Sequence, residues 1–124
     1  KLNEAELALL VPEADTMPAQ MHSLQDYSEA ELLIVTRGAA GAMALASGGE
    51  EFSVEPQGRI GVIDTVGAGD AFTSVMMLGL LRGWSVPLML EHAQAFASAI
   101  TGIRGATKND SGFYQPFIDN WKLT

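Results

Sequence analysis

Cysteine is absent from the 124-residue sequence, and positive charge is scarce. Without cysteine the chain can form neither a disulfide nor a thiolate metal site, a composition that fits a cytoplasmic protein. Seven Lys and Arg residues stand against fifteen Asp and Glu residues, which gives a net charge of −8. Because proteins that follow nucleic-acid phosphates usually carry a basic face, this charge argues against nucleic-acid binding. The two histidines, His22 and His92, are too few and too isolated for a histidine-based metal cluster.

Long apolar segments are also missing. The longest run, residues 75–81, is far too short to cross a bilayer, and no signal peptide opens the chain, so no membrane association is expected. The 48% apolar content still allows one packed domain over residues 1–124. The sequence begins at Lys1 without a methionine and enters a helix signal at once, so we expect it to be a piece of a longer protein.

The apolar patterns predict helices that alternate with strands. Asn3 and Glu6 have the spacing of a capping box, which predicts a first helix from residue 4 that ends before Pro12. Further helices are predicted over residues 18–27, 71–82, 87–103 and 113–121, and strands over residues 32–36, 43–46, 51–55 and 59–63. A Gly-Gly pair between the second and third of these strands predicts a hairpin. The order of elements is typical of an α/β fold.

The predicted helix over residues 71–82 is apolar on nearly every side. Such a helix is normally buried on most of its faces. The neighbours within this chain are too few to cover all of them. We therefore expect an exposed apolar patch through which the chain self-associates.

The most informative segment is Asp64-Thr65-Val66-Gly67-Ala68-Gly69-Asp70-Ala71-Phe72, where a predicted strand leads through a glycine-rich turn into a helix. Glycines let the backbone approach a ligand, and the free amides of a helix N-terminus attract anions. Such an anion hole suits phosphoryl transfer, in which negative charge spreads over the oxygens of the transferred group. Asp70, at its mouth, is a candidate base for an attacking hydroxyl. The alternative is that the glycines form a plain tight turn and Asp70 caps the helix.

This segment resembles the second signature of the ribokinase-like carbohydrate kinases of the phosphofructokinase-B type. The resemblance implies that Asp70 is the catalytic base and that the amides of Gly67, Ala68 and Gly69 form the anion hole. Three other segments are similar to family motifs and follow in the family's order: residues 3–6 to N-x-x-E, residues 36–41 to T-x-G-x-x-G, and residues 104–106 to R-G-A. The implied fold is the C-terminal part of a three-layer, Rossmann-like kinase, a sheet flanked by helices. The first glycine-rich signature, most sugar contacts and the lid belong to an N-terminal half that is not in this sequence.

The resemblance also assigns binding residues. ATP is expected between residues 36–41 and the helix around residues 94–98, with contacts from Asn3, Thr36, Gly38, Gly41 and Gln94. Glu6 is expected to position Mg²⁺ through water, although Asn3 and Glu6 also fit a simple helix cap, and residues 36–41 an ordinary exit from a strand. Many family members hold K⁺ at the positions of Asp64, Val66, Ile100, Gly105 and Asn109. Asp64 can instead bond the turn around Gly67.

The implied function is phosphorylation of a small sugar by ATP. Arg104-Gly105-Ala106-Thr107 with Phe113-Tyr114 favours fructokinase-like members and hence fructose. A nucleoside kinase of the same superfamily, which carries the same signature, is one alternative. The other is that the chain is not an enzyme but an inert nucleotide-binding fragment. We expect this chain by itself not to phosphorylate a sugar.

Overall fold

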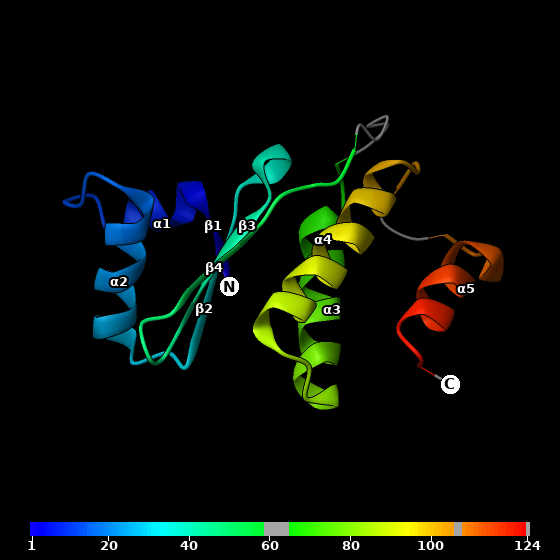
Figure 1. Ribbon diagram of the computed structural model, residues 1–124. Helices are drawn as coiled ribbons and strands as arrows, with labels where there is room; N and C mark the ends of the chain where they lie inside the picture. Colours follow the sequence, from blue (N-terminus) through cyan, green and yellow to red (C-terminus); the bar gives the residue numbers. More distant parts are fainter. Residues whose placement is uncertain (59–64, 106–107, 124) are drawn as a thin grey trace.

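The computed structural model describes residues 1–58, 65–105 and 108–123 (Figure 1). The predicted strand over residues 59–63 and the candidate ligand Asp64 lie outside them. In chain order the described elements are β1 (Leu2–Asn3), α1 (Glu4–Leu10), α2 (Met17–Ser28), β2 (Leu32–Thr36), the 3-10 helix η1 (Gly38–Ala40), β3 (Ala42–Ala46), β4 (Glu51–Val54), α3 (Ala68–Arg82), α4 (Val86–Thr101) and α5 (Ser111–Asn120).

The four described strands form one sheet in the order β1-β2-β3-β4. Strand β1 runs parallel to β2, with Asn3 opposite Thr36, whereas β2, β3 and β4 form an antiparallel meander. The predicted hairpin joins β3 to β4, and its turn is closed by the Gly49 amide, which donates to the Ala46 carbonyl at 2.9 Å. Strand β1 was not predicted, because two residues give no periodic signal and only the pairing with β2 makes them a strand.

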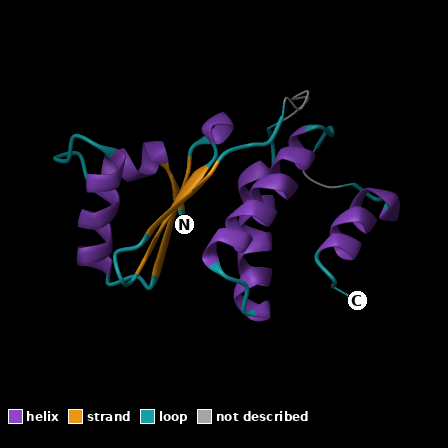
Figure 2. Ribbon diagram, viewed as in Figure 1, coloured by secondary structure: helices purple, strands orange, loops and turns teal. Residues whose placement is uncertain are grey.

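Helices cover both faces of the sheet (Figure 2). Leu33 and Val35 pack with α1 and α2 on one face, while Ile34 packs with α3 and α4 on the other. Strand β2 is therefore apolar at successive positions, as expected for a strand that is covered on both sides. The predicted three-layer α/β fold is confirmed.

Helix α3 begins three residues before its predicted start. Gly67 adopts a left-handed backbone with φ 83° and acts as the N-cap, so the helix already includes Ala68, Gly69 and Asp70. The glycine-rich segment was expected to be a turn throughout, but only one residue needs the glycine conformation. The ends of the other described helices and of β2, β3 and β4 lie within two residues of the prediction.

The outer side of α3 is apolar and exposed. Phe72 and Val75 are buried on its inner side, but Met77, Leu80 and Leu81 are 60%, 61% and 86% exposed. No described element covers this outer side, so the neighbours within this chain are too few to bury the helix on all faces. The expected apolar patch is present. In the part of the chain that the structure describes, no helix is both long and apolar enough to span a membrane.

Helix α5 lies against the side of α4 through aromatic rings. Phe96 of α4 meets Phe117 of α5 edge to face, with ring centroids 5.1 Å apart. The ring of His92 lies between Trp84 and Trp121, 4.9 Å from the centroid of each. Burial among these rings lowers the pKa of His92, and Glu91 opposes this shift.

Candidate active site

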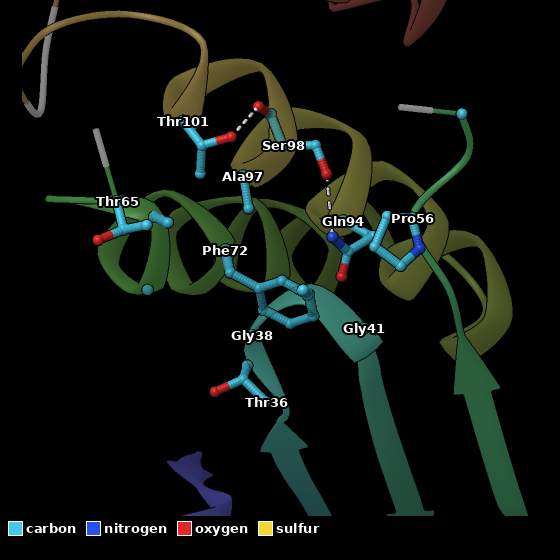
Figure 3. Close-up of a pocket in the computed structure, with 14 residues that line it drawn as sticks. Thr36, Gly38, Gly41, Pro56, Thr65, Phe72, Gln94, Ala97, Ser98 and Thr101 are labelled. Carbon is cyan, nitrogen blue, oxygen red and sulfur yellow. Dashed lines mark hydrogen bonds between the residues drawn. The ribbon is translucent and has the colours of Figure 1, made fainter. Parts of the chain in front are cut away.

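A cavity of about 580 Å³ opens between α3, α4 and the loops that follow β2 and β4 (Figure 3). Most of its lining is small or apolar, and the polar groups come from threonine, serine and glutamine side chains and from glycine backbone. The lining residues are Thr36, Gly38, Ala39, Gly41, Pro56, Gly58, Thr65, Ala68, Gly69, Phe72, Gln94, Ala97, Ser98 and Thr101. A volume of this size accommodates a small-molecule ligand.

The cavity has two distinct ends. Thr65 and Thr101 lie at one end, beside the start of α3, and Gln94 and Pro56 lie at the other (Figure 3). Gln94 and Thr101 are seven residues apart on α4, which corresponds to about 10 Å along a helix axis. The two ends can therefore contact chemically different parts of one elongated ligand.

The first end carries groups that attract negative charge. Helix geometry leaves the amides of the first turn of α3 without intrahelical acceptors, and the helix dipole adds partial positive charge. The Ala68 amide donates to the Thr65 carbonyl at 3.3 Å, which is a long hydrogen bond. A Cβ placed on Gly69 would lie 3.7 Å from Nζ of Lys1, so an ammonium group adjoins the same turn. Within the described residues, no carboxylate forms an ion pair with Lys1.

Asp70 lies in the first turn of α3 and is exposed. It follows directly on Gly69, which lines the cavity, but is not itself a lining residue. Its side chain forms no ion pair with the described residues. The carboxylate is thus exposed to solvent on the first turn of α3, one residue after a residue that lines the cavity.

The loop after β2 forms one wall of the cavity. Thr36 ends the strand, Gly38 has φ 55° and Gly41 has φ 94°. A Cβ on Gly41 would collide with the Val54 carbonyl oxygen, so this position requires glycine for two reasons. The Arg37 amide closes the loop by donating to the Gly41 carbonyl at 2.8 Å. Predicted ATP contacts Thr36, Gly38, Gly41 and Gln94 therefore lie around one cavity.

Asn3 and Glu6 do not line the cavity. They form a complete capping box: the Glu6 amide donates to Oδ1 of Asn3 at 2.8 Å, and the Asn3 amide donates to Oε1 of Glu6 at 3.0 Å. The predicted capping box is thus confirmed. The register of β1 with β2 nevertheless puts Asn3 beside Thr36, one strand away from the cavity.

The residues predicted to hold K⁺ are described only in part, because Asp64 lies outside the described ranges. Val66 is 59% exposed and Ile100 is 2% exposed, and the Ile100 carbonyl accepts from the Ile103 amide at 3.2 Å. Gly105 has φ 83° and Asn109 is exposed. The described side chains include no group of three or more His, Cys, Asp or Glu that could hold a metal.

The sequence argument missed several lining residues and the nearby Lys1. Ala97 and Ser98 lie in the predicted segment 94–98, but Thr101 was missed, although it shares one face of α4 with Gln94 at helical spacing. Phe72 was read only as part of the signature, although it is 2% exposed and lines the cavity. Nothing in the sequence indicates that Lys1 lies beside Gly69, because this proximity depends on the fold.

Residues 1–111 match the model of the pfkB family carbohydrate kinases, which is most of the chain. The chain belongs to this family. Among curated proteins it is similar to 5-dehydro-2-deoxygluconokinase of Listeria monocytogenes serotype 4a (strain HCC23), with 30% identity over 94 residues. That match covers 76% of this chain and 27% of the relative, so the chain spans about a quarter of the length of this kinase.

Solved structures of pfkB-type kinases show the same fold. Escherichia coli phosphofructokinase-2, solved in complex with potassium, has a TM-score of 0.78 and 26% identity, over 98% of this chain and 41% of that one. Arabidopsis thaliana ribokinase, solved with ribose and ATP, has a TM-score of 0.73 and 26% identity, over 84% of this chain and 34% of that one. Homologous kinases therefore bind ATP, a sugar or potassium, and this chain corresponds to a part of such an enzyme.

Proposed function

We propose that this chain supplies the nucleotide site and the catalytic base of an enzyme that transfers the γ-phosphoryl group of ATP to a sugar hydroxyl. The observation that carries the proposal is the first turn of α3. There Gly69 lines the end of a ligand-sized cavity, and Asp70, the next residue, is exposed to solvent. Membership of the pfkB family supports the assignment of both residues.

In this proposal the nucleotide lies along the cavity. Its phosphates bind at the start of α3, where free amides and the helix dipole stabilise negative charge. Its base binds about 10 Å away, toward Gln94, a separation estimated from the rise of α4. Asp70 takes the proton from the attacking hydroxyl, and the amides of Gly67, Ala68 and Gly69 stabilise the charge on the transferred group. Lys1, whose Nζ adjoins Gly69, adds a mobile positive charge at the same place.

Magnesium fits this site as an ion that arrives with the nucleotide. Mg²⁺ usually keeps several waters and is held by one or two carboxylates together with substrate phosphates, so a preformed cluster of acidic residues is not required. Glu6 is the proposed carboxylate, acting through water. When bound, the ion would neutralise phosphate charge. For K⁺, the site of Asp64, Val66, Ile100, Gly105 and Asn109 stays a prediction, to which the potassium complex of phosphofructokinase-2 lends support.

The acceptor is proposed only as a class, a hydroxyl of a small sugar or sugar acid. Fructose is the candidate from the sequence, and 5-dehydro-2-deoxygluconate is added by the names of the curated relatives. These relatives are much longer than this chain, so we expect selection of the sugar, and turnover itself, to need further parts of such an enzyme. A nucleoside acceptor is the alternative within the same superfamily.

A phosphorylation screen tests the proposal. The whole enzyme that contains this chain is incubated with Mg·ATP and, separately, with fructose, fructose 6-phosphate, ribose, 5-dehydro-2-deoxygluconate or adenosine, and acceptor-dependent ADP release is measured. We expect release with one of the sugars. Release with adenosine alone would favour the nucleoside kinase, and no release with any acceptor, from a protein that binds ATP, would contradict the proposed reaction.

A further inference from the structure

Helix α5 is held against α4 by aromatic rings rather than by a buried core. No residue of α5 is buried. Its Phe113 and Phe117 lie against the ring of Phe96, with ring centroids 6.4 and 5.1 Å away. Pro116, inside the helix, has no N–H to donate to a helical hydrogen bond. Because a helix of ten residues is marginally stable in water, α5 depends on this docking to stay helical.

His92 lies where the end of α5 meets α4. Its ring stacks on Trp121, the residue that caps α5, at an interplanar angle of 29°. Its other neighbour, Trp84, follows α3 and meets the His92 ring edge to face at 76°. The two indoles also contact each other, with ring centroids 6.0 Å apart. One titratable ring therefore joins three elements: α4, α5 and the turn after α3.

The charged side chains around this cluster form no ion pair with His92 in the part of the chain that the structure describes. Arg82, at the end of α3, donates to the Leu123 carbonyl at 3.1 Å. Lys108 and Asp110, at the other end of α5, pair with each other at 3.8 Å. The remaining charged side chains, all exposed, are Glu91 on α4 and, on or just after α5, Asp119 and Lys122. Among the described residues, His92 thus has no ion-pair partner that would hold a proton on its ring.

We propose that His92 makes the docking of α5 on α4 sensitive to pH, with α5 released as the solution becomes acidic. A charged ring between two indoles would lose the water that stabilises its charge, whereas the neutral ring loses much less. Release of α5 returns the ring to water and removes this penalty. The inference is independent of the proposed phosphoryl transfer, although α4 also forms one wall of the cavity.

The direction of the effect follows from proton linkage. Burial holds the pKa of docked His92 below its ordinary value of 6.5, and the charge of Glu91 opposes this shift. The chain with α5 released therefore binds the proton more readily. Docking is thus strongest above pH 6.5 and weakens as the pH falls below it. Uptake of one proton changes the opening equilibrium by at most about ten-fold per pH unit.

Hydrogen–deuterium exchange of the whole enzyme tests the proposal at about pH 7.5 and about pH 5.5, with rates corrected for the intrinsic effect of pH. The exchange of α5 is compared with that of β2, which is covered on both faces. The variants are His92→Gln and His92→Phe, neither of which can titrate at this position, and the control His22→Gln. His22 is the other histidine of this sequence and pairs with Glu51 of β4 at 2.7 Å. Melting temperatures show whether each variant is folded.

We expect acid to increase the exchange of α5 relative to β2 several-fold in the wild type and in His22→Gln. The ratio should not respond to pH in His92→Gln or in His92→Phe, which keeps an aromatic ring between the indoles. If one of these two variants does not fold, the other decides.

The inference is overturned if α5 in the wild type shows no response to acid, or if the His92 variants respond as the wild type does. Equal loss of protection in α5 and β2 would also overturn it, because the whole fold then opens and not the docked helix. An indole face attracts a cation, so the contact with Trp121 acts against release; slower exchange of α5 at low pH would show that this attraction dominates and would overturn the inference too. A response confined to α5 in an enzyme that phosphorylates no acceptor would support the inference while contradicting the proposed reaction.

Discussion

Gly69→Ala should separate the function of the glycine-rich turn from its role in the fold. Gly69 is the second residue of α3, and its φ is not in the left-handed region. An added Cβ would meet only Nζ of Lys1, at 3.7 Å, which is an ordinary contact. Alanine is favoured over glycine within a helix by up to about 1 kcal/mol. The free energy of unfolding should therefore stay the same or rise slightly.

Turnover should nevertheless fall sharply in this variant. Because Gly69 lines the anion-binding end of the cavity, its new methyl group would occupy space that the transferred phosphoryl group needs. The amide of residue 69 is retained, but a phosphoryl group displaced from it loses that hydrogen bond, and loss of one preorganised donor typically costs about 10² to 10³ in kcat. Gly41→Ala should instead lower the free energy of unfolding, because its Cβ collides with the Val54 carbonyl oxygen and the fold itself is damaged.

The assay pairs chemical denaturation with acceptor-dependent ADP release by the whole enzyme. Gly48→Ala is the matched control, because this turn glycine faces only the Glu50 side chain, 3.6 Å from the added Cβ, and does not line the cavity. Normal turnover by a stable Gly69→Ala enzyme would refute the reasoning. In that case the turn is a plain connector, and its amides do not bind the phosphates.

Three further predictions concern single side chains. Asp70→Asn should lower kcat by about 10² to 10⁴, the usual contribution of a positioned base, while the affinity for ADP changes little; near-normal kcat would exclude Asp70 as the base. Lys1→Met should reduce kcat at least several-fold without changing the melting temperature, whereas Lys122→Met, an exposed lysine after α5, should not affect turnover; equal effects of the two would remove Lys1 from the site. Burial lowers the pKa of His92 below 6.5, so the unfolded chain binds the proton more readily than the folded chain. The free energy of unfolding should therefore be highest above pH 6.5 and fall as the pH drops through the folded-state pKa of His92. Urea denaturation at pH 7.5 and 5.5 checks this, and an equal fall in His92→Gln would assign the effect to other groups.

The sequence predicted most of the fold because its elements are locally specified. Strand β2 and the hairpin of β3 and β4 follow from apolar runs and a Gly-Gly turn, and α1 follows from its capping box. Two features of the fold could not be predicted from local sequence patterns. Strand β1 exists through its pairing with β2, and the early start of α3 depends on one left-handed residue, Gly67, which a string of glycines does not distinguish from its neighbours.

For the candidate site, the sequence indicated the correct segments but not their relative positions. Thr36, Gly69 and Gln94 come from three distant segments, and only the folded chain puts them around one cavity. Lys1 was missed for a related reason, because a lysine carries no motif of its own, whereas Phe72 was read as part of the signature but not as a residue that lines a cavity. Asn3 and Glu6 show the converse limit, since a motif that suits both a helix cap and a ligand site is first of all a cap in this chain.

The exposed side of α3 leads to a last prediction, about the 124-residue chain by itself. Leu80 and Leu81 of α3 are 61% and 86% exposed. The neighbouring helix α4 covers only the other side of α3. Adjacent apolar side chains of this exposure favour association with a second copy. Sedimentation velocity should therefore show concentration-dependent self-association, and Leu80→Lys with Leu81→Lys should reduce it. Leu9→Lys is the control, because Leu9 is 82% exposed on α1, across the sheet from α3 (Figure 1). A chain that stays monomeric, or an equal effect of Leu9→Lys, would contradict a role for the α3 surface.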